Sequence, residues 1–213
     1  MQSNWSAKAG LLWQIPCRDA LVTAAQLQHR VPCWGYVFEE RLQPAAGAAN
    51  TTSSSSSSTG DVGADRPRGR RVVLLGDTVD SRAIAPIALG ADLVSHEATF
   101  AAGMEGKAAQ AQHSTAWMAG QFAWAIQAKA LVLTHFSARY EGSRANSKWA
   151  PGGGAGVADR RPRAEDVASD AEAEERCIKA LQREADDQYG LGPVLLAIDL
   201  LTAHVPKQEE AEE

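Results

Sequence analysis

The segment "LVSHEATF", residues 93–100, ends an apolar run in a histidine and a glutamate, and the interpretation of the whole chain starts from it. Leu93 and Val94 suit a buried strand. His96 and Glu97, in contrast, cost free energy to bury unless hydrogen bonds or an opposite charge compensate them. A strand that ends in this way indicates a binding site at its carboxyl end.

Apolar runs of strand length alternate with helical patterns along most of the chain. The runs are nearly unbroken, which is typical of strands that are covered on both faces of a sheet. The first two strands flank "QHRVP" and are predicted to form an antiparallel pair joined by a turn. The alternation predicts an α/β fold with helices covering at least one face of the sheet. Strands are predicted at 18–27, 33–40, 70–77, 91–96, 130–135 and 193–199, with an edge piece at 201–205, and helices at 81–90, 114–129 and 166–189.

The helix predicted over 114–129 has the clearest apolar stripe. Ser114 or Thr115 can cap its N-terminus, because a hydroxyl at that position accepts a backbone N–H. Trp117 and Trp124 extend the stripe, so both are predicted to be core residues rather than platforms for stacked bases. The stripe itself consists of Met118, Phe122, Ala125 and Ile126, and the inward positions of the helix at 166–189 are Val167, Ala171, Ile178, Leu181 and Ala185.

Two segments have a composition that cannot form a packed core. Residues 43–70 contain a run of six serines, and residues 141–165 are rich in glycine and charged residues. Such segments bury too little apolar surface to offset the entropy of ordering the backbone, so both are predicted to be disordered. The remainder divides into N-terminal strands (1–42), an α/β core (71–140), a C-terminal helix and strand (166–206) and an acidic tail (207–213).

Charge and cysteine content narrow the functional classes. A net charge of −5 argues against a large surface that tracks nucleic-acid phosphates. The three cysteines, Cys17, Cys33 and Cys177, lack the spacing of a thiolate metal site and indicate a reducing intracellular compartment, whether cytosol, nucleus or organelle. No apolar run reaches the ~18 residues that a membrane-spanning helix needs.

Three successive strands end in ionisable residues, namely Asp77, His96 and His135. In an α/β sheet the carboxyl ends of neighbouring strands lie side by side, at the edge where ligands bind. Imidazole and carboxylate groups together suit zinc. Glu97 follows His96, and His113 stands directly before the helix cap, so this pair can move a proton near a bound metal. Each residue also has a structural interpretation, as a turn residue, a helix-flanking residue or a partner of the backbone.

Five short motifs follow one another along the chain: "QHRVPCWGYVFEE" at 28–40, "GDT" at 76–78, "HEATF" at 96–100, "HST" at 113–115 and "LTHFSARY" at 133–140. In this order they resemble ribonuclease Z, the endonuclease of the metallo-β-lactamase superfamily that processes the 3′ end of tRNA. The combination of "HEAT" with "HST" separates this family from other metallo-β-lactamases. The resemblance covers roughly residues 20–40, 70–140 and 190–205.

The resemblance implies a site for two zinc ions. His29 resembles a ligand of one zinc, Asp77 the carboxylate that bridges both, and His135 a ligand of the second. Glu97 and His113 resemble the proton-relay pair of the family, in which the histidine protonates the departing ribose oxygen. The implied reaction is hydrolysis of a phosphodiester in precursor tRNA, which leaves a tRNA with a 3′-hydroxyl.

One motif of the family, "HxHxDH", has no counterpart in this chain. The resemblance therefore implies only the C-terminal half of the enzyme, which is half of an αββα sandwich: one mixed sheet with helices on its outer face. The inner face would lack the sheet that buries it, so we expect a homodimer or a complementary N-terminal half. His96 is expected to be structural. The chain has five histidines, His29, His96, His113, His135 and His204, and these with Asp77 give at most three of the family's zinc ligands.

Three interpretations remain open at this stage. The first is part of a zinc-dependent tRNA 3′ endonuclease, and the second is a non-catalytic half that pairs with another metallo-β-lactamase chain. The third is a different metallo-β-lactamase hydrolase, which "HEATF" together with "HST" disfavours. The intact Glu97 and His113 favour the first, because a structural remnant has no chemical need for them. The absence of "HxHxDH" favours the second.

Overall fold

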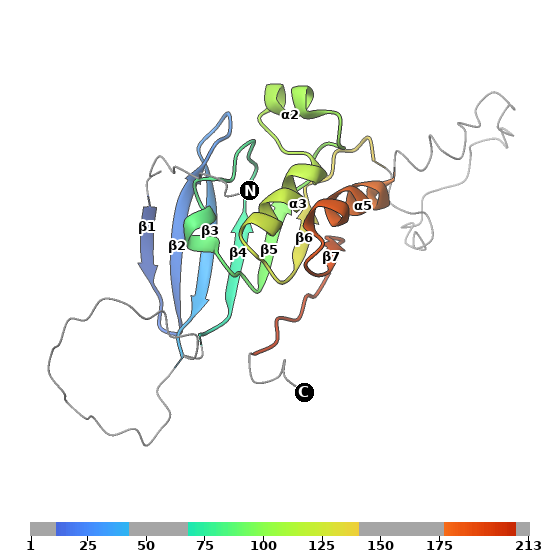
Figure 1. Ribbon diagram of the computed structural model, residues 1–213. Coiled ribbons are helices and arrows are strands. Elements are labelled where there is room, and N and C mark those ends of the chain that lie inside the picture. The colour runs from blue at the N-terminus through green and yellow to red at the C-terminus, as the bar shows by residue number, and fades with distance from the viewer. Residues whose placement is uncertain (1–11, 43–67, 141–176, 208–213) are drawn as a thin grey trace, which may run out of the picture.

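The computed structural model describes residues 12–42, 68–140 and 177–207, which form a seven-stranded sheet (Figure 1). Its order follows the sequence from β1 to β7. Strands β1 to β4 pair antiparallel, whereas β4 to β7 pair parallel, so the predicted mixed sheet is confirmed. The strands are β1 (Leu12–Pro16), β2 (Ala20–Leu27), β3 (Cys33–Glu40), β4 (Arg71–Leu75), β5 (Leu93–Glu97), β6 (Leu131–Thr134) and β7 (Val194–Leu196).

The described helices are α1 (Ala85–Ala88), α2 (Glu105–Ala111), α3 (Ala116–Ala125) and α5 (Ile178–Tyr189). Helices α1, α3 and α5 lie over one face of the sheet, and α2 lies beyond one end of the strands, at the top of Figure 1. None of these four helices is long and apolar enough to cross a membrane.

The core lies between the sheet and the helices α3 and α5. Val37, Val73 and Val94, from three adjacent strands, point into it and are almost completely buried. A Cβ on Gly120 of α3 would lie only 2.3 Å from the carbonyl oxygen of Ala185 on α5. The glycine therefore lets the two helices approach closely, and the pair covers the sheet as one layer.

The helix predicted over 81–90 is shorter in the structure, where it spans only Ala85–Ala88. Helix α1 has a single turn. Pro86 in its first turn has no N–H that could bond to an earlier turn, and Gly90 after its end adopts a left-handed φ of 65°. Helix α3 starts as predicted, since the Thr115 hydroxyl accepts the backbone N–H of Met118 at 3.2 Å. The strands predicted between residues 18 and 199 are confirmed, with shifted ends.

The apolar stripe of α3 was predicted correctly for Phe122 and Ile126, which are buried, but not for Trp124. Trp124 is 49% exposed, and Trp117 is half-buried. The buried residues of α3 are mostly small instead, namely Ala116, Ala119, Gly120 and Ala123 besides Phe122. Periodicity therefore placed the stripe about one residue too far around the helix.

Two described elements, β1 and α2, have no counterpart in the prediction. Helix α2 buries only Ala108, so no apolar stripe marks it in the sequence. In α5, Leu181 and Ala185 are fully buried as predicted, whereas the described part of the chain has no strand at 201–205. The predictions for 43–67, 141–176 and 208–213, including Val167 and Ala171, fall outside the described residues.

None of the described helices covers the opposite face of the sheet (Figure 1). Tyr36 and Leu74, paired across β3 and β4, are 37% and 42% exposed on this face. Trp13 on β1 is 56% exposed and lies edge-on to Trp34, with the ring centroids 6.2 Å apart. Apolar surface of this extent on a sheet is typical of a face that packs against another layer.

His96 lies at the junction of the core and the site, and it belongs to the core. Its ring is fully buried, donates from Nδ1 to the Glu97 carbonyl at 2.8 Å, and accepts at Nε2 from the Ser81 hydroxyl at 2.7 Å. Phe122 packs against it with the ring centroids 5.5 Å apart. This environment fixes one neutral tautomer, so His96 is structural, as expected.

Stability should fall in mildly acidic solution because of His96. Burial lowers the pKa of His96 below its ordinary value, so below about pH 6.5 the unfolded chain takes up a proton that the folded chain does not. We expect His96→Gln to reduce the pH dependence of the free energy of unfolding between pH 7 and pH 5, by up to about 1.4 kcal/mol per pH unit. Urea unfolding across this range measures it. His204→Ala, at an exposed histidine, is the control, and an unchanged slope in His96→Gln would contradict the assignment.

Candidate metal centre

The five predicted site residues gather at the carboxyl edge of the parallel strands. Asp77 follows β4, Glu97 ends β5 and His135 follows β6. His113 lies between α2 and α3. His29 lies in the turn between β2 and β3, which reaches the same edge because β3 runs antiparallel to β4.

Hydrogen bonds tie the turn of His29 to the loop of Asp77. The backbone N–H of Val79 donates to the Gln28 carbonyl at 2.9 Å. The hydroxyl of Thr78 lies 3.1 Å from the same carbonyl. Because Gln28 and Thr78 are the direct neighbours of His29 and Asp77, these contacts hold the two site residues next to each other.

The Glu97 carboxylate is the most enclosed group of the site, since the residue is only 1% exposed. It accepts the backbone N–H of Thr78 at 2.6 Å and the hydroxyl of Thr99 at 2.5 Å. His113 Nδ1 lies 3.1 Å from each of its two oxygens. These three donors explain why a core strand can end in a carboxylate, because each replaces a hydrogen bond that burial removes.

Two of the site histidines have Nδ1 held by an oxygen that can only accept. His29 Nδ1 lies 2.6 Å from the Gln112 carbonyl, so Nδ1 carries the proton. His113 Nδ1 faces the Glu97 carboxylate in the same way. In the neutral form of both rings, Nε2 then carries the free lone pair. Histidines that bind a metal through Nε2 have this arrangement.

Thr99 gives His135 the same hydrogen-bonding arrangement, in which Nδ1 donates its proton. Its hydroxyl has one proton and makes its shortest contact, 2.5 Å, with Glu97. Donation to Glu97 leaves the Thr99 oxygen free to accept from His135 Nδ1, which lies at 2.8 Å. Thr99 therefore links the carboxylate to His135, and in the neutral ring Nε2 carries the free lone pair.

The backbone of His135 adopts a left-handed φ of 56°, which is uncommon for a residue with a side chain. Its Nε2 lies 3.4 Å from Oδ2 of Asp77. Two ligands of a tetrahedral zinc, each about 2.0–2.2 Å from the metal, are themselves roughly 3.4 Å apart. The two side chains are therefore already spaced like neighbours in a zinc coordination shell.

Two overlapping groups of side chains could hold a metal ion. One is His29, Asp77 and His113, and the other is Glu97, His113 and His135, with the ligand atoms of each group within 4.8 Å of one another. Imidazole nitrogen and carboxylate oxygen are donors that zinc prefers. The residues therefore fit zinc, and the described ones suffice for one ion but not for two closed tetrahedral sites.

Sequence reasoning did not find three residues that support the site, namely Thr78, Thr99 and Gln112. Thr99 carried a signal, because it stands two residues after Glu97 and residues at this spacing share one face of a strand. Gln112 acts through its carbonyl, and Thr78 binds Glu97 through its backbone N–H, so the sequence gives no sign of either contact.

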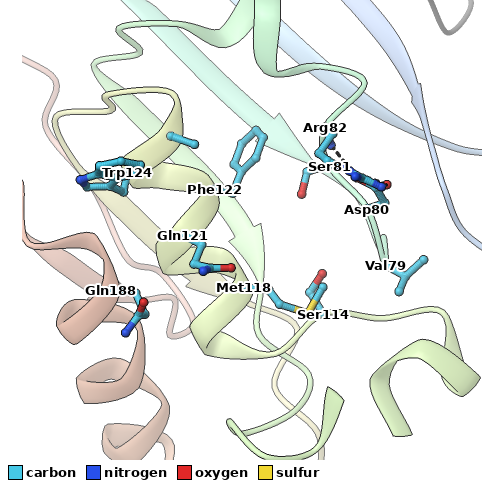
Figure 2. A pocket seen from close by; sticks show the side chains of 11 residues that line it. Val79, Asp80, Ser81, Arg82, Ser114, Met118, Gln121, Phe122, Trp124 and Gln188 are labelled. Carbon is cyan, nitrogen blue, oxygen red and sulfur yellow. Dashed lines mark hydrogen bonds and ion pairs between the residues drawn. The ribbon is translucent and has the colours of Figure 1, made fainter. Parts of the chain in front are cut away.

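A cavity of about 580 Å³ lies between the loop at 79–82 and α3 (Figure 2). Phe122 and Trp124 line it from α3. Ser114, which directly follows the site residue His113 in the sequence, also lines it.

No protein-family model matches the chain. Ribonuclease Z of Prochlorococcus marinus (strain MIT 9303) is 40% identical over 147 residues, which cover 58% of this chain and 46% of that protein. Ribonuclease Z of Parabacteroides distasonis is 34% identical over 146 residues, which cover 58% and 48% of the two chains. The resemblance to ribonuclease Z is confirmed. The chain spans about half the length of the curated ribonuclease Z relatives that it matches.

Two solved structures resemble the described fold. The metallo-β-lactamase fold protein YhfI from Bacillus subtilis has a TM-score of 0.50 at 18% identity, covering 87% of this chain and 49% of that one. The short form of human tRNase Z has a TM-score of 0.50 at 23% identity, covering 90% of this chain and 46% of that one. The predicted fold class is thereby confirmed, as part of a metallo-β-lactamase fold.

The bridging role of Thr99 predicts a difference between two substitutions. Thr99→Val keeps the side-chain shape but removes the hydroxyl that joins Glu97 to His135, so we expect a loss of about 1–3 kcal/mol in the free energy of unfolding. Thr99→Ser keeps the hydroxyl and serves as the matched variant, with a smaller loss. Urea denaturation of the purified chain measures both. A loss in Thr99→Ser that equals or exceeds the loss in Thr99→Val would contradict the bridging role of the hydroxyl.

Proposed function

We propose that this chain forms part of a zinc-dependent endoribonuclease that removes 3′ trailers from precursor tRNA by phosphodiester hydrolysis. The observation that supports this best is the buried Glu97–His113 pair beside Asp77 and His135. A structural remnant gains nothing from a carboxylate–imidazole pair at a metal site. Hydrolysis of a phosphodiester, in contrast, needs a proton donor for the departing oxygen.

Zinc would be held by His29, Asp77 and His135. Asp77 is suited to a bridging position, because it lies in one group with His29 and its Oδ2 lies 3.4 Å from Nε2 of His135. Bound zinc supplies a Lewis acid that offsets negative charge on the phosphoryl oxygens and activates water.

Glu97 and His113 would provide the proton for the leaving group. The carboxylate holds Nδ1–H of His113, so the other ring nitrogen, Nε2, is the one that exchanges protons with the substrate. When Nε2 is protonated, Glu97 stabilises the positive ring. The proton then passes to the ribose oxygen as its bond to phosphorus breaks, which leaves a 3′-hydroxyl on the tRNA.

The complete site requires the "HxHxDH" motif, either from another part of the same protein or from a partner chain. A second copy of this chain would bring only the same five histidines, so a complementary N-terminal half is favoured over a homodimer. The exposed Trp13, Tyr36 and Leu74 support this, because they give the open face of the sheet an apolar surface on which a second sheet can pack.

A second candidate function is non-catalytic pairing with another metallo-β-lactamase chain. The absence of "HxHxDH" from the chain supports it. In this case the open face would bind its partner, but the Glu97–His113 pair would have no substrate.

Complementation distinguishes the two candidates. The purified chain is mixed with the remaining N-terminal part of the Prochlorococcus ribonuclease Z, and cleavage of a 3′-extended precursor tRNA is measured. We expect the mixture to cleave and neither part to cleave alone. We further expect Glu97→Gln to lower kcat by about 10²-fold or more with zinc content unchanged, because it weakens the proton donor.

His204→Ala is the control for the complementation, because this histidine is exposed and was assigned no role in the site. If the two parts form a stable complex that binds zinc but leaves the RNA intact, the second candidate replaces the first.

A further inference from the structure

We propose that, in this chain by itself, His113 is a zinc ligand together with His29 and Asp77. The inference rests on the zinc-binding part of the proposed function. It gives His113 a role that differs from the proton relay implied by the family resemblance, and it concerns one zinc ion per chain rather than two.

The first argument is proximity. The ligand atoms of His29, Asp77 and His113 lie within 4.8 Å of one another, and the rings of the two histidines are 4.9 Å apart between centroids, at an angle of 61°. Ligands of a tetrahedral zinc are roughly 3.4 Å apart, so shifts of about 1 Å close this group around an ion. His113 belongs to both ligand groups of the described residues and is therefore the central one.

The second argument is orientation. His113 donates its Nδ1–H to Glu97, and His29 donates its Nδ1–H to the Gln112 carbonyl. A carboxylate or carbonyl behind the ring is the usual support of a zinc-binding histidine, because it fixes the tautomer and raises the basicity of the free nitrogen. Gln112 and His113 are adjacent in sequence, so one short segment positions both rings.

The third argument is charge. A divalent ion that is partly withdrawn from solvent needs negative charge close by. Asp77 would bind the ion directly, and Glu97 would face it through the ring of His113. Two carboxylates offset the two charges of zinc without any group from outside the chain. Asp77 and His135 are partly exposed, which gives the ion a path from solvent.

Zinc binding by His113 would exclude its role in proton transfer. In a ring whose Nδ1–H is bound to Glu97 and whose Nε2 is bound to zinc, Nε2 carries no proton that could pass to the substrate. Ligands from an added "HxHxDH" segment would take over the ion and release Nε2 of His113. The chain alone would thus bind metal in an inactive arrangement, and completion of the site would convert His113 from ligand to proton donor.

Zinc affinity tests the proposal without any RNA. Zinc is titrated into the metal-free chain in competition with a chromophoric chelator, for the wild type, His113→Ala and His204→Ala. We expect His113→Ala to bind zinc at least about tenfold more weakly, and His204→Ala to bind like the wild type. Cobalt(II) in place of zinc should give the intense visible absorption of a four-coordinate site in the wild type and lose it in His113→Ala.

A zinc affinity and a cobalt spectrum in His113→Ala that match the wild type would overturn the proposal. Should the variant fail to fold, the wild-type chain still gives an answer through the side-chain ¹⁵N resonances of its histidines. Zinc should shift Nε2 of His113 strongly, and an unshifted Nε2 would exclude it as a ligand.

This result and that of complementation are independent. Loss of zinc binding in His113→Ala with no RNA cleavage in the completed complex would support the ligand and refute the nuclease. Cleavage with unaltered zinc binding in His113→Ala would do the reverse.

Discussion

The buried carboxylate of Glu97 connects segments that are far apart in the sequence. It receives hydrogen bonds from the loop after β4, from the residue that follows β5 by two positions, and from the segment before α3. Through Thr99 it also sets the ring of His135 after β6. Burial makes each of these donors necessary, because a carboxylate without them would be too costly in the core. One electrostatic requirement therefore fixes the relative positions of most of the candidate site.

The position of that carboxylate depends in turn on the sheet. Strand β4 pairs antiparallel with β3 on one side and parallel with β5 on the other, so the turn after β2 and the ends of β4, β5 and β6 all reach one edge. His29 and Asp77 meet there although they are 48 positions apart in the sequence. A parallel strand in place of β3 would carry the turn of His29 to the opposite edge of the sheet.

Much of this could be predicted from the sequence, because unbroken apolar runs identify buried strands and ionisable residues at their ends identify the edge. The predictions that were wrong or missing have physical causes. Helix α2 buries one alanine and so leaves no stripe. In α3 the buried positions are mostly small residues, which a pattern of large apolar residues such as Trp124 does not reveal. At the site, side-chain chemistry was predictable for the five residues singled out, whereas contacts made through the backbone, like that of Gln112, depend on the folded chain.

The two faces of the sheet differ in how they are covered. The helix-covered face has a complete core, with His96 satisfied within it, so the strand ends and their hydrogen bonds can form without a partner. The open face and the candidate metal ligands both lie outside that core. The other half of the proposed site, whether from the same protein or from a partner chain, would add apolar cover and metal ligands to an edge that is already ordered. Because Glu97 and Thr99 already orient His113 and His135, binding would not have to offset the entropy of arranging those side chains.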